Sequence, residues 1–399
     1  MGVAGGEKIL ADRVVHIGAP KCGSTALQSA FFQHRVVLRA KGIAYIGKSA
    51  HWIKAVKAVV QAEDRLTGTV PPLSEWRRLV EEVRRASGAV PNGVTALVSS
   101  EWFAGATDEQ VNFIASELDA SRMRVVLVIR PLTSTLPAAW QQRLQLGEKE
   151  HFSEWLKLIL EKPEDPRAKR HWSKHRYDLV AQRWANVIGA DRVTVVVADE
   201  QRKDFIYAAF ENILNVTNGV MATVPNRTNP SLSAFEADTL AELNRIYFEH
   251  GGSPREYREG ALRTFDGYVN SLRSGAVERT VIPAEHLGEI QHLNATISAG
   301  IRATGCQVLG NLDQFAGVAQ NHFVETATTT PPLAHVGRAQ RETDVRSAAG
   351  MIYALMVTTG VANPLSPLPG FGGRGRLFQH QLSSLVRRLG QLIKIAINR

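Results

Sequence analysis

The stretch RVVHIGAPKCGSTALQ, residues 13–28, decides the fold. Arg13–Ile17 is typical of a buried strand, a turn rich in glycine and proline follows, and a helix is expected directly after it. The glycines let the backbone turn sharply, so that several amide groups converge on one point. The helix N-terminus adds partial positive charge, and Lys21 adds a full charge. The stretch therefore predicts a strand–loop–helix unit that binds a phosphate group.

The loop differs from the phosphate-binding loop of nucleoside triphosphatases, in which a lysine directly follows the second glycine. Gly18 and Gly23 keep the spacing of that motif, but Ser24 takes the lysine's place and the lysine stands at position 21. The charge of a lysine inside the loop can neutralise negative charge on a group that the loop binds. In nucleoside triphosphatases, Mg²⁺ also helps to neutralise the triphosphate.

Further buried strands are expected without polar alternation, each separated from the next by a helix. This pattern predicts an α/β fold, a P-loop-like parallel sheet with helices on both faces. Ligands in such sheets bind at the carboxyl ends of the strands, where Lys21, Glu101 and Arg130 follow three different strands. The expected strands after the first are 42–46, 94–98, 124–129 and 192–197.

Helices are expected between and after these strands, from apolar residues at three- and four-residue spacing. Ser74 is the expected N-cap inside the second helical region. The expected helices are 26–39, 51–86, 108–120, 136–145, 152–160, 176–188, 235–249, 283–303 and a helix that includes 351–357.

The composition excludes several classes of protein. Cys22 and Cys306 are the two cysteines of a 399-residue chain, so no disulfide framework or metal-ligand spacing is present in the sequence. The N-terminus lacks an apolar signal segment, and no run of about 18 apolar residues occurs. These features predict a cytoplasmic enzyme without a bound metal.

The net charge of +9 is concentrated in the C-terminal tail. Residues 346–399 contain seven basic and no acidic residues, which leaves about +2 for residues 1–345. The charge of residues 1–345 therefore gives no indication of nucleic-acid binding, and zinc-finger and RNA-binding signatures are absent from the sequence.

The expected organisation is a catalytic domain, 1–325, then a linker region with one short helix, 326–376, and a basic amphipathic helix, 377–399. Such a helix can lie on an anionic membrane, here the inner face of the cell membrane. Alternatively, its apolar stripe packs on the catalytic domain or on a second subunit of an oligomer.

The loop sequence P-K-x-G-[ST]-T resembles the 5′-phosphosulfate loop of the sulfotransferase superfamily, in particular of its bacterial-type members. These enzymes use 3′-phosphoadenosine 5′-phosphosulfate (PAPS) and release 3′-phosphoadenosine 5′-phosphate (PAP). The resemblance covers roughly residues 13–315. It implies that the donor's 5′-phosphosulfate is bound by Pro20, Lys21, Cys22, Gly23, Ser24 and Thr25.

A second segment, VVLVIRPLTSTLPAAWQQ (125–142), resembles the family's strand that ends in an arginine for the 3′-phosphate. Arg130 matches that arginine. The family's serine falls near Ala138, so Ser134, Thr135 or backbone amides would take over its contact.

A third segment, PNRTNPSLS (225–233), is similar to the Gly-Arg-x-His-Pro lid of carbohydrate sulfotransferases, which also contacts the 3′-phosphate. Asn226 and Asn229 stand where the family has glycine and histidine. The resemblance implies that Arg227 and Thr228 contribute to donor binding.

Transfer of a sulfuryl group to an alcohol or amine needs a base for the incoming nucleophile. In related enzymes, the strand before the arginine strand ends in the catalytic residue, and here that strand ends in Ser99, Ser100 and Glu101. We expect Glu101 to be the base. His51, after the 42–46 strand, is the alternative, and Glu101 would otherwise cap the helical turn 102–106.

These observations predict a PAPS-dependent transferase that acts on a hydroxyl or amine of a carbohydrate, a glycolipid or a small molecule. One alternative is a P-loop kinase or NTPase, because VTVVVADE (193–200) resembles a Walker B strand with Asp199 as a Mg²⁺ ligand. The other is a membrane-associated scaffold without catalytic activity, suggested only by the basic tail.

Overall fold

Strand β1 (Arg13–Gly18) runs through the middle of a six-stranded sheet, between β3 (Thr95–Ser99) and β4 (Met123–Ile129). The computed structural model describes residues 13–47, 52–64, 68–88, 94–202, 204–217, 219–221, 231–263, 265–266, 269, 278–317 and 338–358. All neighbouring strands pair in parallel, in the order β2-β3-β1-β4-β5-β6. The remaining strands are β2 (Ile43–Tyr45), β5 (Val193–Val197) and β6 (Gln307–Leu309).

The central strands are buried on both faces, as their continuous apolar sequences predict. Val15 of β1 pairs with Val98 of β3 and with Val125 of β4. Val15 and Val125 are 0% exposed, and Val98 is 2% exposed. The predicted α/β class with a parallel sheet is therefore confirmed, and the carboxyl ends of β1, β3, β4 and β5 share one edge.

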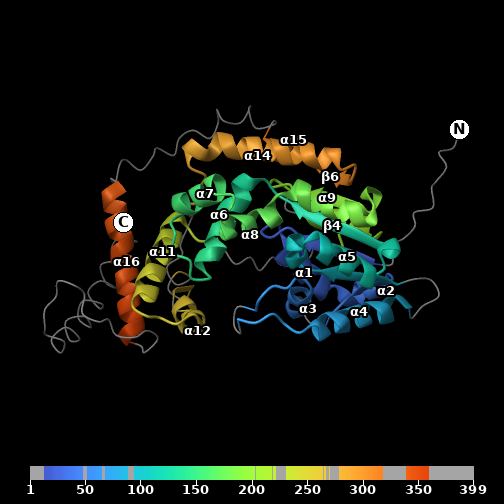
Figure 1. Cartoon of the computed structure of the whole chain (residues 1–399), viewed down its shortest axis with the longest axis horizontal. Coiled ribbons are helices and arrows are strands. Elements are labelled where there is room, and N and C mark those ends of the chain that lie inside the picture. The colour runs from blue at the N-terminus through green and yellow to red at the C-terminus, as the bar shows by residue number, and fades with distance from the viewer. Residues whose placement is uncertain are drawn as a thin grey trace.

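Helices and short helical turns connect the strands and continue beyond the sheet (Figure 1). The elements before β5 are α1 (Ser24–Gln33), α2 (Arg35–Ala40), α3 (Ile53–Val59), α4 (Leu73–Gly88), η1 (Glu101–Gly105), α5 (Asp108–Glu117), η2 (Ala120–Arg122), α6 (Leu132–Leu144), α7 (Phe152–Glu161), α8 (Pro166–His175), α9 (Tyr177–Ile188) and η3 (Ala190–Arg192). Those after β5 are α10 (Phe205–Ile213), α11 (Ala234–Glu249), α12 (Pro254–Glu256), η4 (Tyr257–Ala261), α14 (Ala284–Ala303), α15 (Leu312–Ala316) and α16 (Arg338–Thr358).

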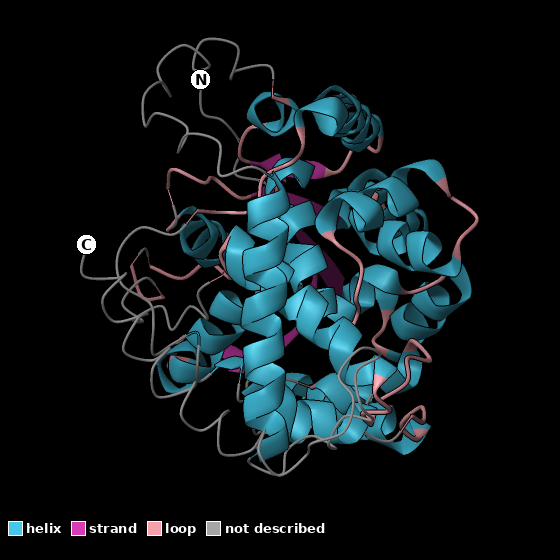
Figure 2. Cartoon of the chain, turned by 90° about the vertical axis from the view of Figure 1, so that its left-hand side faces the viewer, coloured by secondary structure: helices cyan, strands magenta, loops and turns pink. Residues whose placement is uncertain are grey.

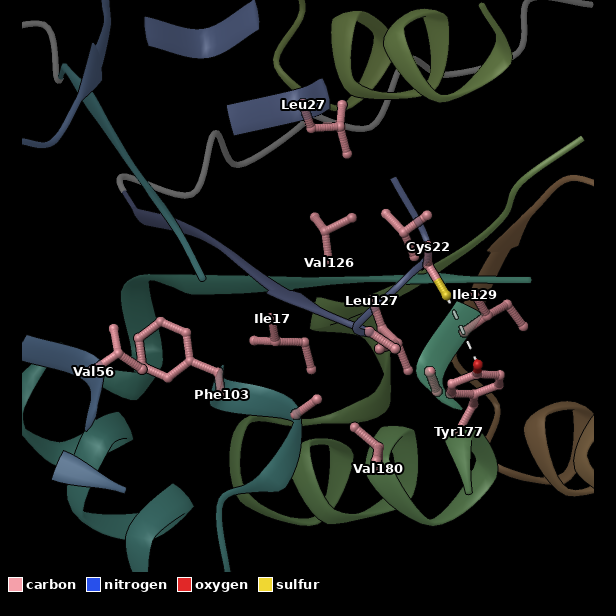
Figure 3. Packing of buried hydrophobic residues seen from close by; sticks show 14 of the residues in the cluster. Ile17, Cys22, Leu27, Val56, Phe103, Val126, Leu127, Ile129, Tyr177 and Val180 are labelled. Carbon is pink, nitrogen blue, oxygen red and sulfur yellow. Dashed lines mark hydrogen bonds between the residues drawn. The ribbon is translucent and has the colours of Figure 1, made fainter. Parts of the chain in front are cut away.

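Aromatic side chains fix the helices to the two faces of the sheet. On one face, Phe210 of α10 packs edge-on against His16 of β1 and Phe31 of α1, with ring centroids 5.3 and 5.2 Å away. On the other face, Phe103 of η1 contacts Trp76 of α4 and Trp184 of α9 (6.2 and 6.4 Å). Ile17 of β1 points toward this second layer, near Phe103 and Val180 (Figure 3). Helices hide most of the strands from view (Figure 2).

Several element boundaries differ from the sequence expectation. The helix expected over 26–39 is broken at His34 into α1 and α2. The region 51–86 contains two helices, α3 and α4, and between them Asp64 and Thr69 form an isolated antiparallel β-bridge. Ser74 lies inside α4, which begins at Leu73, so its predicted role as N-cap was wrong. Helix α8 and the edge strand β6 were not predicted.

The helix expected around 351–357 is α16, which is longer and packs along α11 (Figure 1). The rings of His250 and Tyr353 lie 5.7 Å apart at this contact. The segments 326–332 and 365–375 and the C-terminal helix 377–399 lie outside the described residues. A bilayer-crossing helix is not found in the described part of the chain, where every helix is too short or too polar.

Candidate functional site

The loop between β1 and α1 turns through three residues with positive φ angles: Gly18 (105°), Lys21 (64°) and Gly23 (95°). Glycine adopts this conformation without steric cost, but a lysine there is strained. Strain of this kind is retained where the surrounding structure enforces it, and it is concentrated at functional sites. The loop predicted from the glycine spacing therefore forms, and it fixes the backbone of Lys21.

Hydrogen bonds of Ala19 and Ser24 attach the loop to the core of the protein. The amide of Ala19 donates to the carbonyl oxygen of Val128 in β4 (2.7 Å), and the Ser24 hydroxyl donates to the carbonyl oxygen of Ala19 (3.2 Å). The Cys22 sulfur points into the core and lies 3.8 Å from the Tyr177 hydroxyl (Figure 3). Burial raises the pKa of the Cys22 thiol to about 11, so this thiol is neutral at physiological pH. Cys22 therefore presents only its backbone to the loop.

The N-terminus of α1 opens directly from this loop. Gly23 is the N-cap, no side chain among the described residues caps the helix, and its first turn contains no acidic residue. Ser24 and Thr25 occupy the first two helical positions, and the Thr25 side chain is exposed. The amides of a first helical turn have no partner within the helix. An anion can accept hydrogen bonds from these amides and interact favourably with the helix dipole.

Lys21 lies close to Glu101, which follows β3. Burial lowers the pKa of the Lys21 ammonium, and the negative charge of Glu101 acts in the opposite direction. A partly desolvated cation interacts strongly with negative charge, because less water screens it. Lys21 is therefore suited to meet charge that develops on a bound ligand.

Glu101 is half-buried, and a side chain of α1 holds its carboxylate in place. Nε2 of Gln28 donates to Oε2 of Glu101 (3.2 Å) and is 3.4 Å from the carbonyl oxygen of Ser99. Gln28 itself is 2% exposed, so this contact is fixed by packing. Tyr45 of β2 lies nearby: burial raises the pKa of its hydroxyl, and the charge of Glu101 adds to that effect.

The backbone at Glu101 is also defined. Ser100, not Glu101, is the N-cap of η1, and its hydroxyl oxygen accepts from the amide of Trp102 (3.4 Å). The capping role considered for Glu101 is thus filled by its neighbour. Gly18 lies against Glu101, and a Cβ atom at position 18 would come within 2.9 Å of the Glu101 Cα. The loop and the candidate base are therefore in direct contact.

Arg130 follows β4 and joins the loop to the end of β5. Its Nη1 donates to the carbonyl oxygen of Lys21 (3.5 Å), and its Nη2 donates to Oε1 of Glu200 (2.8 Å). The Ser134 hydroxyl donates to the same Glu200 oxygen. Arg130 and Ser134 therefore already share one anionic oxygen atom.

The structure brings together Lys21, Glu101, Arg130 and Ser134 at the carboxyl edge of the sheet. Thr135 is fully buried, where its hydroxyl lies 3.4 Å from both the Pro131 carbonyl oxygen and the Tyr177 hydroxyl. The predicted site residues outside the described part of the chain are His51, Arg227 and Thr228.

Two site residues were missed in the sequence, Gln28 and Glu200. Gln28 is four positions after Ser24, so both lie on one face of α1, and this spacing was the available signal. Glu200 follows β5, and its pairing with Arg130 depends on β4 and β5 being neighbours in the sheet.

The residue proposed as a Mg²⁺ ligand in the NTPase alternative is used in a local turn. Oδ1 of Asp199 accepts from the amides of Gln201 (2.9 Å) and Arg202 (3.2 Å). Neighbouring Glu200 instead contacts Arg130 and Ser134, as described above.

Buried histidines lie beneath and beside the site. Nδ1 of His16 is 2.7 Å from the Ser99 hydroxyl, and burial lowers the pKa of His16 to about 3. His175 stacks on His171 with centroids 4.1 Å apart, and burial lowers the pKa of His175 to about 4. The rings of His16 and His175 are therefore neutral at physiological pH, and we assign these two residues structural roles.

Comparisons with known proteins give little further information. No protein-family model matches the chain, and no curated protein matches its sequence. A solved structure, a sulfotransferase from Alicyclobacillus acidocaldarius, aligns with a TM-score of 0.38 and 16% sequence identity. The alignment covers 57% of this chain and 89% of that one. Similarity at this level carries no weight for the chemistry of the site.

Proposed function

We propose that the chain is a sulfotransferase that uses PAPS as its donor. The observation that carries the proposal is the N-terminus of α1, which no side chain among the described residues caps and which begins beside the strained Lys21. Arg130 donates to the carbonyl oxygen of Lys21. Glu101 lies close enough to Lys21 for its charge to raise the pKa of the lysine, against the lowering by burial. An anion site and a candidate base thus lie side by side at one sheet edge.

The residues present fit the two charged ends of this donor. The loop amides and Lys21 suit the 5′-phosphosulfate, because backbone amides at a helix start and a cation both favour a compact anion. Arg130 and Ser134 already bind a carboxylate oxygen, so their donors suit the 3′-phosphate. Arg227 and Thr228 would complete that end of the site.

The donor supplies an activated sulfuryl group when it is bound. Glu101 would take the proton of the acceptor hydroxyl or amine as the new bond to sulfur forms. The bond between sulfur and the bridging oxygen breaks at the same time, and Lys21 would stabilise the negative charge that remains on that oxygen of PAP. This charge balance does not require a metal ion.

The acceptor class is proposed more broadly, as a hydroxyl or amine of a carbohydrate, a glycolipid or another small molecule. A lipid-linked acceptor would agree with the basic tail, whose peripheral contact with an anionic membrane stays a prediction, as does an oligomeric state. The cytoplasmic location is likewise a prediction.

Transfer of radiolabelled sulfate from PAPS across a panel of sugars, glycolipids and small alcohols and amines tests the proposal. We expect labelled product with at least one acceptor class and release of an equal amount of PAP. Parallel assays with ATP and Mg²⁺ address the kinase alternative. Transfer of phosphate, with no sulfate transfer from PAPS, would overturn the proposal in favour of that alternative.

A further inference from the structure

Glu200 holds both donors of the site proposed for the 3′-phosphate. Its Oε1 atom accepts from Nη2 of Arg130 (2.8 Å) and from the hydroxyl of Ser134. These residues come from three separate places, the end of β4, the first turn of α6 and the end of β5. A single oxygen that accepts from a guanidinium and a hydroxyl is bound as a phosphate oxygen would be.

The Ser134 hydroxyl can donate only one hydrogen bond, so it cannot donate to Glu200 and to a phosphate at the same time. A serine hydroxyl has one proton to donate, and in this structure Glu200 accepts it. A phosphate dianion offers only acceptor oxygens, so Ser134 cannot bind it while the hydroxyl donates to Glu200. The Nη2 of Arg130 is likewise directed at Glu200, whereas its Nη1 is directed at the Lys21 carbonyl oxygen.

We propose that Glu200 is an internal competitor of the donor's 3′-phosphate, which must displace the carboxylate from Arg130 and Ser134. This inference rests on the proposed function and adds a specificity residue to it. The Arg130 and Glu200 side chains are 34% and 44% exposed, so the carboxylate can leave for water at low cost. Nucleotides without a 3′-phosphate leave Glu200 in place and gain nothing from its removal.

The alternative role for Glu200 is to orient Arg130 for the phosphate. The two roles predict opposite effects of Glu200→Gln, which removes the negative charge and keeps the shape. A competitor's removal tightens binding of the 3′-phosphate, whereas removal of an orienting residue weakens it.

Isothermal titration calorimetry with PAP and with adenosine 5′-phosphate distinguishes these roles. For Glu200→Gln we expect PAP to bind about fivefold to tenfold more tightly than to the wild type, and adenosine 5′-phosphate to change less than twofold. The control is Glu161→Gln, which removes one exposed carboxylate that pairs with Lys157 on α7. In the Arg130→Ala background, Glu200→Gln should give a smaller gain for PAP, because one of the two competed donors is already lost.

The outcomes separate this inference from the proposed function. Unchanged or weaker PAP binding by Glu200→Gln, with measurable binding by the wild type, overturns the competitor role and leaves the proposed function standing. An equal gain for both nucleotides, or for Glu161→Gln, also overturns it, since the effect would be one of general charge. If neither the wild type nor Glu200→Gln binds PAP, the proposed function fails and the inference fails with it.

Discussion

Gly18 and Glu101 touch through their backbones, at the carboxyl ends of two neighbouring strands. A Cβ atom at position 18 would lie 2.9 Å from the Cα and 3.1 Å from the Cβ of Glu101. Gly18 also has a φ of +105°, which a side chain would strain. The position of Glu101, the candidate base, thus depends on Gly18 at the start of the loop between β1 and α1.

Gly18→Ala should therefore displace Glu101 as well as strain the loop. We expect a loss of about 1–3 kcal/mol in the free energy of unfolding and a fall in kcat. Gly42→Ala is the matched control, because Gly42 has a φ of +80° with no atom within 4 Å of the added Cβ. Chemical denaturation and steady-state kinetics would measure both. Equal losses of activity in the two variants would contradict the link between Gly18 and the base.

Lys21→Ala should lower kcat by about 100-fold or more, because the lysine charge matters most as the bridging bond breaks. The fold should persist, since the loop is held by backbone contacts of Ala19 and by Ser24. Lys157→Ala on the surface of α7 controls for the loss of a positive charge. Near-normal turnover by Lys21→Ala would rule out the mechanism proposed above.

Arg130→Ala should reduce discrimination between PAPS and adenosine 5′-phosphosulfate, which lacks the 3′-phosphate. A charge-assisted contact in a partly exposed site justifies a loss of about tenfold in PAP affinity. Titration of wild type and variant with PAP measures this, and Arg170→Ala on α8 is the control. Equal PAP affinity in wild type and Arg130→Ala would show that the arginine has no such role.

Glu101→Gln keeps the size of the side chain and removes its basicity. We expect kcat to fall about 100-fold or more with little change in PAPS affinity, and the acid limb of the pH–rate profile to flatten. Gln28→Ala should lower kcat less, because it removes only the contact that holds Oε2. An acid limb that survives in Glu101→Gln would transfer the role of base to His51.

Acid should destabilise the fold through its buried histidines. The pKa values of His16 and His175 are lowered from 6.5 to about 3 and about 4, so the unfolded chain binds more protons than the native one between these values. Stability is therefore full above about pH 6.5 and falls as the pH decreases, with the His175 contribution alone reaching ~3 kcal/mol near pH 4.

Urea denaturation between pH 7 and pH 4 tests this dependence. His175→Gln should show a shallower fall of the unfolding free energy with pH than the wild type shows. A wild-type slope in His175→Gln would assign the acid sensitivity to other groups.

The sequence was sufficient to predict the sheet because its central strands are buried on both faces. The continuous apolar run 125–129 fits a strand that is covered on both faces, and the glycines of the loop mark the turn that follows β1. The short edge strand β6 has only three residues, with Gln307 exposed, so it carries too little pattern to be recognised.

The local chemistry of the site was predictable, but its contacts were not. Lys21, Glu101 and Arg130 follow strand ends, and a parallel sheet brings such ends to one edge. The contacts of Gln28 and Glu200 depend on helix orientation and strand order, which a single sequence does not specify. The start of α6 was missed for a local reason, since Pro137 lies inside the helix and suggested a later start.

The strand order has a consequence for how the chain folds. Strand β1 is made first, yet its partners β3 and β4 follow much later, and the contact between His16 and Ser99 spans 83 positions. Closing such long loops costs entropy before any contact repays it, so this core should assemble slowly. During synthesis, β1 leaves the ribosome before its partners, and it can pair with β3 before β4 has been made. The loop that carries Lys21 is bonded to β4 through Ala19 and Val128, so it cannot reach its native geometry before residue 128 has been made.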